Sequence, residues 1–241
     1  MNYKKEIRRM RWLAAMLMLV AAMVVPSVAW AENYDENGFG NESDPYKPAE
    51  QVSESHHPEL KETYNGYYAI ENAGQLYWFA QRVNSGNTDI NAVLTTNITV
   101  NTGDVANCEG VKADGWRDWT RIGINMGYAY TGTFDGNGKT ISGLYFNGSS
   151  TDYVGLFGIN KGTIKNVGIV NSYIKGYGTV GGVCGWNRGG TIQKCYNKGI
   201  VIGDNSVGGV CGANEATDAT ATITECYNTG NVSGSDNVGG V

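Results

Sequence analysis

The sequence predicts an all-β protein built as a right-handed parallel β-helix, a solenoid, with a short capping helix near its N-terminal end. Three observations support this prediction. A glycine-rich phrase returns at nearly constant intervals, no proline follows Pro58, and bursts of Val and Ile alternate with turn pairs such as Asn65-Gly66. Proline cannot donate to a β-ladder, so its absence suits a chain devoted to strand pairing. Repeats of this length are typical of solenoids, and crossover chirality favours the right hand.

The first 31 residues have the pattern of a secretory signal peptide. Five Lys and Arg residues precede or open the apolar run Trp12–Val25, and Pro26 follows it. This run is too short to span a bilayer comfortably, and Ala29-Trp30-Ala31 matches a small-x-small cleavage site. We therefore expect cleavage after Ala31 and a secreted or cell-surface protein.

The charge balance excludes two classes of partner. Without the predicted signal peptide the chain has 13 basic and 22 acidic residues, a net charge of −9. Nucleic acid and anionic membranes both require a basic face, so neither is expected to bind. A second apolar stretch long enough to span a bilayer is absent from the sequence, so no membrane insertion is expected after signal cleavage.

Residues 32–63 are predicted to form a disordered acidic linker. They contain nine acids, two lysines and three of the four prolines of the chain. Such a segment buries too little apolar surface to offset the entropy of ordering it. Both histidines, His56 and His57, lie here and are interpreted as solvated. The folded part therefore has no histidine for a catalytic triad or a zinc site.

Residues 64–153 are predicted to form the N-terminal cap and the first turns. Within them, Glu71–Asn84 has apolar residues at spacing i, i+3, i+4 and i+7 from Leu76, which is one face of a helix. Ser85-Gly86 supplies a stop signal. A single short helix before many strands is expected to cover the open end of the β-structure.

Residues 154–241 are predicted to form the regular repeats, with an incomplete last turn. Periods start at Val154, Val180 and Val207 and span 26, 27 and 31 residues, each with three strand-like pieces. One turn buries four or five aliphatic groups at roughly 1.5–3 kcal/mol each, and ordering its backbone costs roughly 1–2 kcal/mol per residue, so turns must stack. Because a fourth period opens at Val238, we expect a downstream part of the same polypeptide.

Two spacings do not fit a flat strand. Val180 and Val183 are three residues apart, as are Ile192 and Cys195, and a period of two would point the members of each pair in opposite directions. A bulge or a corner between them is expected, and the sequence leaves both open.

Four cysteines occupy equivalent places in successive repeats. Stacked turns lie about 4.8 Å apart, within the Cα range of a disulfide, whereas residues facing each other across the core are about 10 Å apart. If bridges form, Cys184–Cys211 and Cys195–Cys226 are the expected pairs. The alternative is small buried thiols that fill a narrow core. Cys108 has no partner in phase with it.

An evenly spaced asparagine row is expected to stack at one corner of the solenoid. Asn160, Asn187 and Asn214 recur every 27 residues, and asparagine tolerates left-handed backbone and stacks amide to amide. We interpret the row as structural. The alternative is a row of polar ligands for a sugar.

The corner after this row varies in length and is the predicted ligand-facing loop. Seven steps separate Gly185 from Ile192, but eleven separate the equivalent Gly212 from Ile223. Insertions at one corner of a solenoid map to exposed loops that often bind partners. The residues predicted to face a ligand are Trp186, Arg188, Glu215 and Asp218.

Catalytic, cofactor-binding and metal-binding residues are not predicted. Asp114, Asp118 and Asp135 lie near aromatic residues and could run glycoside chemistry, but their spacing does not fix their separation. The cysteine spacings contain no CxxC, and no HExxH, GxSxG or P-loop motif occurs in a supporting context. No cofactor is expected.

The repeats resemble those of GLUG-repeat proteins of bacterial surfaces. The matching pieces are VGLFGINKGTIKNVGI (Val154–Ile169), VGGVCGWNRGGTIQKCYNKG (Val180–Gly199) and the related phrase at Val207–Gly234. The lead-in from Tyr64 also resembles that family. The resemblance implies a secreted or surface-attached β-helix with adhesin-like or scaffold roles. Similar repeats are found in immunoglobulin A-cleaving metallopeptidases, whose zinc motif this chain lacks, so no catalytic residue carries over.

Two classes of function remain open. The first is a non-enzymatic surface β-helix that binds a host glycan or an extracellular protein through its corner loops. The second is a carbohydrate-active β-helix, either a polysaccharide lyase or a glycosidase, or the repeat region of a longer surface protease. Fold analogy alone supports an enzyme, so we expect this chain not to be one.

Overall fold

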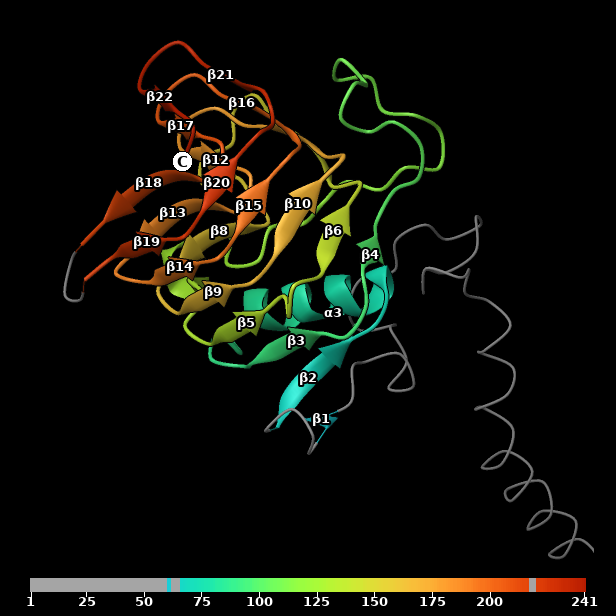
Figure 1. Cartoon of the computed structure of the whole chain (residues 1–241), viewed down its shortest axis with the longest axis vertical. Helices are drawn as coiled ribbons and strands as arrows, with labels where there is room; N and C mark the ends of the chain where they lie inside the picture. Colours follow the sequence, from blue (N-terminus) through green and yellow to red (C-terminus); the bar gives the residue numbers. More distant parts are fainter. Residues whose placement is uncertain (1–59, 62–65, 217–219) are drawn as a thin grey trace, which may run out of the picture.

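The chain is a β-solenoid of about six turns, with one α-helix among its described residues (Figure 1). A computed structural model describes residues 60–61, 66–216 and 220–241. Every pairing of named strands is parallel except that of β1 with β2. This confirms the predicted parallel β-helix with a short helix. The predicted signal peptide and most of the predicted linker lie outside the described residues, and β1 falls at the linker's end.

Five sheets run along the solenoid. The longest joins β1 (Leu60–Lys61), β2 (Tyr67–Ile70), β3 (Ala92–Leu94), β5 (Thr133–Asp135), β9 (Thr163–Lys165), β14 (Thr191–Gln193) and β19 (Thr222–Thr224). The second joins β4 (Ile98–Thr99), β6 (Thr140–Ser142), β10 (Gly168–Val170), β15 (Tyr196–Asn197) and β20 (Tyr227–Asn228). The third joins β7 (Tyr145–Asn147), β11 (Tyr173–Lys175), β16 (Ile200–Ile202) and β21 (Val232–Ser233). The fourth joins β12 (Val180–Gly181), β17 (Val207–Gly208) and β22 (Val238–Gly239), and the fifth β8 (Phe157–Asn160), β13 (Cys184–Arg188) and β18 (Cys211–Glu215).

Equivalent residues of successive turns form columns. Val180 pairs with Val207, which pairs with Val238. The backbone N–H of Val183 donates to the carbonyl of Val210 at 2.9 Å, so these two also lie side by side. The in-register stacking predicted from the repeat phrases is therefore confirmed.

In the turns that start at Val180 and Val207, the three predicted strand-like pieces are five short strands, because corners break two of the pieces. Ile192 lies within β14, which ends at Gln193, Lys194 takes a left-handed φ of 54°, and Cys195 immediately precedes β15 on the next side of the turn. The interval between Val180 and Val183 also changes sheet, from β12 to β13. Both ambiguous spacings are therefore corners.

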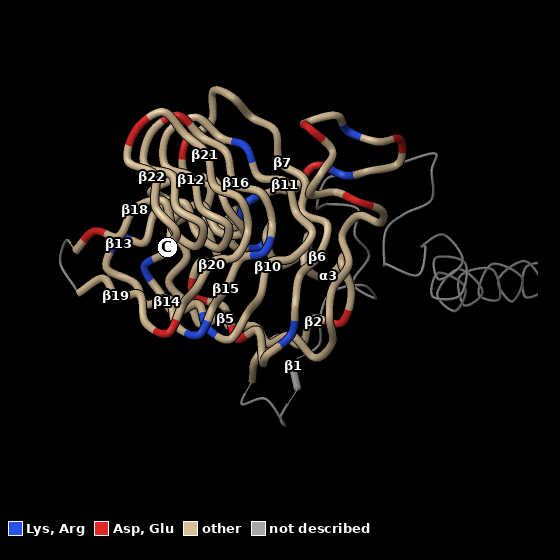
Figure 2. Tube along the Cα trace, turned by 45° about the horizontal axis from the view of Figure 1, so that its top comes forward, with Lys and Arg blue, Asp and Glu red and all other residues tan. Residues whose placement is uncertain are grey.

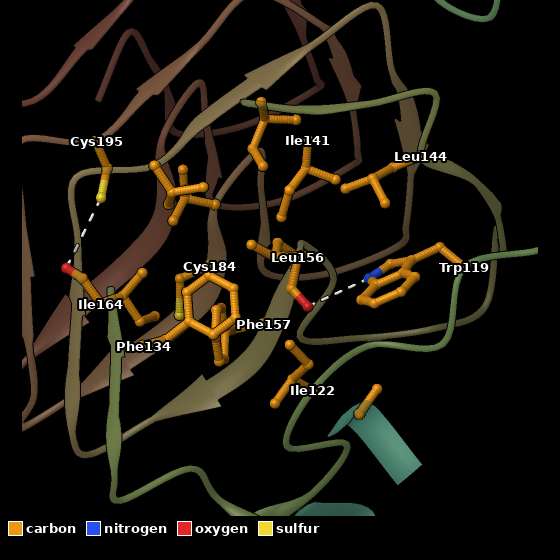
Figure 3. Packing of buried hydrophobic residues seen from close by; sticks show 14 of the residues in the cluster. Trp119, Ile122, Phe134, Ile141, Leu144, Leu156, Phe157, Ile164, Cys184 and Cys195 are labelled. Carbon is orange, nitrogen blue, oxygen red and sulfur yellow. Dashed lines mark hydrogen bonds between the residues drawn. The ribbon is translucent and has the colours of Figure 1, made fainter. Parts of the chain in front are cut away.

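The helix α3 (Ala73–Asn84) covers the N-terminal end of the core, as predicted. The Asn72 side chain caps it by accepting from the Gln75 N–H at 2.9 Å. Its apolar face packs into the same core as the strands, where Phe79 lies 5.9 Å from Tyr130, ring centroid to ring centroid. Trp119 is buried in the same core, and its Nε1–H donates to the Leu156 carbonyl at 3.2 Å (Figure 3).

A loop between β4 and η5 (Met126–Tyr128), a 3₁₀ helix, packs on the outside of the third sheet. Val105 is fully buried there against Tyr145 and Tyr173, beside the partly buried Trp116. The Tyr145 hydroxyl donates to the Gly110 carbonyl at 2.8 Å. This second apolar cluster fixes the loop on the solenoid.

The predicted asparagine ladder is present and buried. Asn160 Nδ2 donates to Asn187 Oδ1 at 2.8 Å, and Asn187 Nδ2 donates to Asn214 Oδ1 at 2.7 Å. Asn160 and Asn187 are fully buried, so their amides support the fold and do not face a sugar. The expected left-handed backbone is wrong here, since all three lie in strands. Positive φ occurs instead at residues such as Asn166 and Asn171, which lie between strands.

A second ladder was not predicted. Asn197 Nδ2 donates to Asn228 Oδ1 at 2.9 Å, and each amide also bonds the backbone two residues ahead, at Gly199 and Gly230. Each asparagine thus closes its own corner and ties it to the next turn. A Cβ on Gly182 would lie 2.6 Å from the Asn197 amide carbon, so only glycine fits opposite this ladder.

Replacing Asn187 with Ala is expected to destabilise the solenoid. The substitution removes the acceptor of the Asn160 amide and the donor to Asn214 in a buried place, at a cost of about 1–3 kcal/mol. The urea midpoint of unfolding should fall. The exposed Asn205→Ala is the matched control, and equal midpoints for the two variants would contradict the structural role of the ladder.

Candidate binding surface

Trp186 lies on β13 and stacks on an aromatic residue of the preceding turn. Its ring and that of Tyr153 have centroids 5.2 Å apart and an interplanar angle of 20°. Both side chains are half-buried. The Trp186 column continues with the buried Ile159 in the preceding turn and with Ala213 in the next. One face of the indole is therefore occupied by Tyr153.

Arg188, two residues along the same strand, extends over the indole. Its Cζ lies 4.9 Å from the Trp186 ring centroid, and its Nη1 lies 3.0 Å from the Met126 Sδ. A thioether is only a weak acceptor. The Nε of Arg188 is buried without a hydrogen-bond partner in the described part of the chain. Among the described residues, the one hydrogen bond of this guanidinium is therefore the weak one from Nη1 to the Met126 Sδ.

The turn before that of β8 completes this surface through η5. Asn125 accepts from the N–H groups of Gly127 and Tyr128, which fixes the 3₁₀ turn. Met126 and Tyr128 are about two-fifths exposed. Tyr130 bridges to Asn160 on β8, so the segment runs alongside the fifth sheet. We call the set Met126, Tyr128, Tyr153, Trp186 and Arg188 the aromatic–arginine surface.

The other two predicted loop residues lie differently. Glu215 is the Cα partner of Arg188 in the next turn and is exposed. No ion pair joins the two among the residues that the structure describes. Asp218 lies outside the described residues. The structure thus brings Trp186 and Arg188 together and places Glu215 one turn away.

Sequence reasoning missed Tyr153, Met126 and Tyr128. The repeat carries a signal for Tyr153, because it precedes Val154 as Thr179 precedes Val180, which places it at a corner. Met126 and Tyr128 lie in a segment outside the repeat period. Only the folded chain shows that this segment reaches β13.

The predicted cysteine pairs are in register. Cys184 and Cys211 are Cα partners, and Cys195 and Cys226 immediately precede the partners Tyr196 and Tyr227. All five cysteines of the chain are free thiols in the structure. Burial raises the pKa of the Cys184 thiol well above its ordinary value, and its contact with Cys211 adds to this.

The three acids considered for glycoside chemistry have separate surroundings. Asp118 pairs with Lys112 at 2.6 Å on the exposed loop, where Asp114 is also exposed. Asp135, on β5, pairs with Lys165 at 3.2 Å and accepts from Asn166 Nδ2 at 2.9 Å. Within residues 60–61, 66–216 and 220–241, no hydrogen bond joins any two of these carboxylates, and no group of three potential metal ligands occurs.

Charged residues of both signs are interspersed along the corners and on the outer loop in the view of Figure 2. Helices long and apolar enough to cross a membrane do not occur among the described residues.

The fold and this surface define a β-solenoid with an aromatic–arginine patch on one sheet. No family model matches the chain. Over 95 residues, 39% of this chain, it is 40% identical to "Halomucin" from Haloquadratum walsbyi, and it spans 1% of that protein. Its fold is similar to that of a candidate immunoglobulin A1 protease from Bacteroides ovatus. The TM-score is 0.55, the identity 24%, and the match covers 69% of this chain and 48% of the other. The second likeness shows the fold alone.

Asp135 is expected to make stability depend on pH. Its burial opposes ionisation, but hydrogen bonds from Asn166 and the Asn137 N–H, with Lys165 nearby, outweigh this and lower its pKa. At pH 7 the Asp135→Asn variant should have a free energy of unfolding about 1 kcal/mol lower than that of the wild type. Because folding lowers the pKa of Asp135, the wild type should keep its whole stability advantage over the variant above the ordinary Asp pKa of about 3.9. The advantage should shrink as the pH falls below that value. Urea unfolding of both proteins between pH 7 and pH 2 measures the difference in unfolding free energy. A difference that stays constant over this range would contradict the prediction.

Proposed function

We propose that this chain is a non-enzymatic secreted or cell-surface β-solenoid with an adhesin-like or scaffold role. The aromatic–arginine surface binds its partner, which is an extracellular protein. The stacked turns supply a rigid support, and the side chains that contact the partner come from three successive turns.

The comparisons support a surface role in two ways. The halomucin likeness supports a surface or secreted location, in agreement with the predicted signal peptide. The likeness to the candidate protease supports the solenoid fold, on which the proposed scaffold role depends. Protease activity does not follow from it, because the likeness concerns the fold.

One observation carries the proposal: Arg188 lies over Trp186, and its Nη1 has only the weak acceptor Met126 Sδ as a partner. Trp, Tyr and Arg dominate the energetics of protein–protein contacts, because they combine large apolar area with directed hydrogen bonds. A carboxylate or backbone carbonyl of a partner would satisfy the guanidinium. A glycan is less favoured, since Tyr153 already stacks on the Trp186 ring.

Arg188→Ala is expected to weaken binding of the mature chain to an extracellular protein at least about tenfold, the effect of losing one interface anchor. Partners are first found on arrays of extracellular-matrix proteins and of glycans. Affinity is then measured for each variant by surface plasmon resonance.

Lys198→Ala is the matched control. Lys198 Nζ lies 5.3 Å from the Tyr196 ring centroid, so it is also a cation over an aromatic ring, but on another sheet. The Lys198→Ala variant should bind the partner with the same affinity as the wild type. If both variants lost affinity equally, the lost positive charge alone would explain the effect, which would contradict a specific role of the aromatic–arginine surface. Binding to glycans alone would contradict the proposed partner class.

A further inference from the structure

Cys195 and Cys226 form a thiol pair at a corner between the first and second sheets. They follow Lys194 and Glu225, both left-handed at φ 54°, and precede the paired strands β15 and β20. Neighbouring parallel strands lie about 4.8 Å apart, which falls within the Cα separation of disulfides. The pair therefore joins two successive turns without any change of register.

The two sulfur atoms make equivalent carbonyl contacts but differ in exposure. The Cys226 Sγ lies 3.2 Å from the Thr224 carbonyl and 3.7 Å from that of Ile192. The Cys226 Sγ accepts the backbone N–H of Cys195 at 3.4 Å and is partly exposed. The Cys195 Sγ is fully buried and lies 3.2 Å from the Gln193 carbonyl and 3.7 Å from that of Ile164 (Figure 3). One sulfur is thus within reach of solvent, and the other lies behind it.

Hydrogen bonding reinforces this difference. A hydrogen bond from the Cys195 thiol favours the thiolate of Cys226 and lowers its pKa to about 7. The same bond, together with burial, raises the pKa of Cys195. The thiolate is the reacting form of cysteine, so Cys226 is the nucleophile of the pair and Cys195 remains a thiol.

A second pair in the same protein supplies a comparison. Cys184 and Cys211 are stacked in register in the same way, but both are buried, with 0% and 4% exposure. The two pairs share their stacking and differ in access to solvent. Stacking alone therefore does not define a reactive site.

We propose that Cys195 and Cys226 are a thiol–disulfide exchange site that reacts with small disulfides such as glutathione disulfide. The Cys226 thiolate attacks one sulfur, forming a mixed disulfide and releasing one glutathione thiolate. Cys195 then gives its proton to solvent, attacks the Cys226 Sγ and releases the second glutathione. The cysteines lose two electrons and two protons, and one glutathione disulfide becomes two thiols.

The product ties β20 to the preceding turn. The predicted secretion would expose the pair to an oxidising environment, in which such bonds persist.

The test is performed on the reduced mature chain exposed to glutathione disulfide. Samples are quenched with acid, alkylated with N-ethylmaleimide and mapped by mass spectrometry. Cleavage after Lys, Arg and Glu places each cysteine on its own peptide. The expected product is a Cys195–Cys226 cross-link, with Cys184 and Cys211 alkylated. In the reduced chain, Cys226 should alkylate at least about tenfold faster than Cys211.

Variants separate the two steps. Cys195→Ser should stop the reaction at a glutathione adduct on Cys226, and Cys226→Ser should prevent any adduct on Cys195. Cys211→Ser is the matched control and should react like the wild type. Alkylation of Cys226 no faster than that of Cys211, or a cross-link of either residue to Cys108, would overturn the proposal. The wild-type map decides this even if a variant fails to fold.

Discussion

The structure depends on the pairing of each turn's backbone with the equivalent backbone of the next. Once Val180, Val207 and Val238 share a column, every other side chain of those turns is placed as well. Each side chain therefore packs against the equivalent side chain of the neighbouring turn. This explains why buried asparagines are tolerated: each amide has donors and acceptors on opposite sides, so a column of amides satisfies itself.

Corners are the second requirement, because a turn with five short strands changes direction after every two to five residues. Left-handed residues such as Lys194 and Glu225 make one corner. Glycines make another, where Gly182 leaves room for the Asn197 amide. From Val180 onward the narrow core is filled by branched side chains and thiols, whereas the earlier turns also hold buried aromatic rings such as Trp119 and Phe157. Length variation is confined to the exposed corners, since an insertion there leaves the columns in register.

The regular columns support the fold, and the exposed side chains and loops upon them are available for recognition. The columns are rigid because each backbone bond is repeated in the neighbouring turns, and surface side chains are held at fixed places upon them. Trp186 and Arg188 project from β13, and Met126 comes from a segment outside the repeats. The surface therefore combines a regular sheet with an irregular loop, a common arrangement for binding sites.

The sequence by itself determined the stacking, the helix over Leu76–Val83 and the asparagine column, because each is written as a periodicity of the chain. It also contained the Asn197–Asn228 ladder, as two YN phrases at equivalent places in successive repeats. It did not determine the Tyr153–Trp186 stack, the reach of Arg188 to Met126 or the different access of the two cysteine pairs. These depend on which non-repeating segment covers which part of the solenoid. That is a matter of packing in three dimensions, and no spacing along the chain records it.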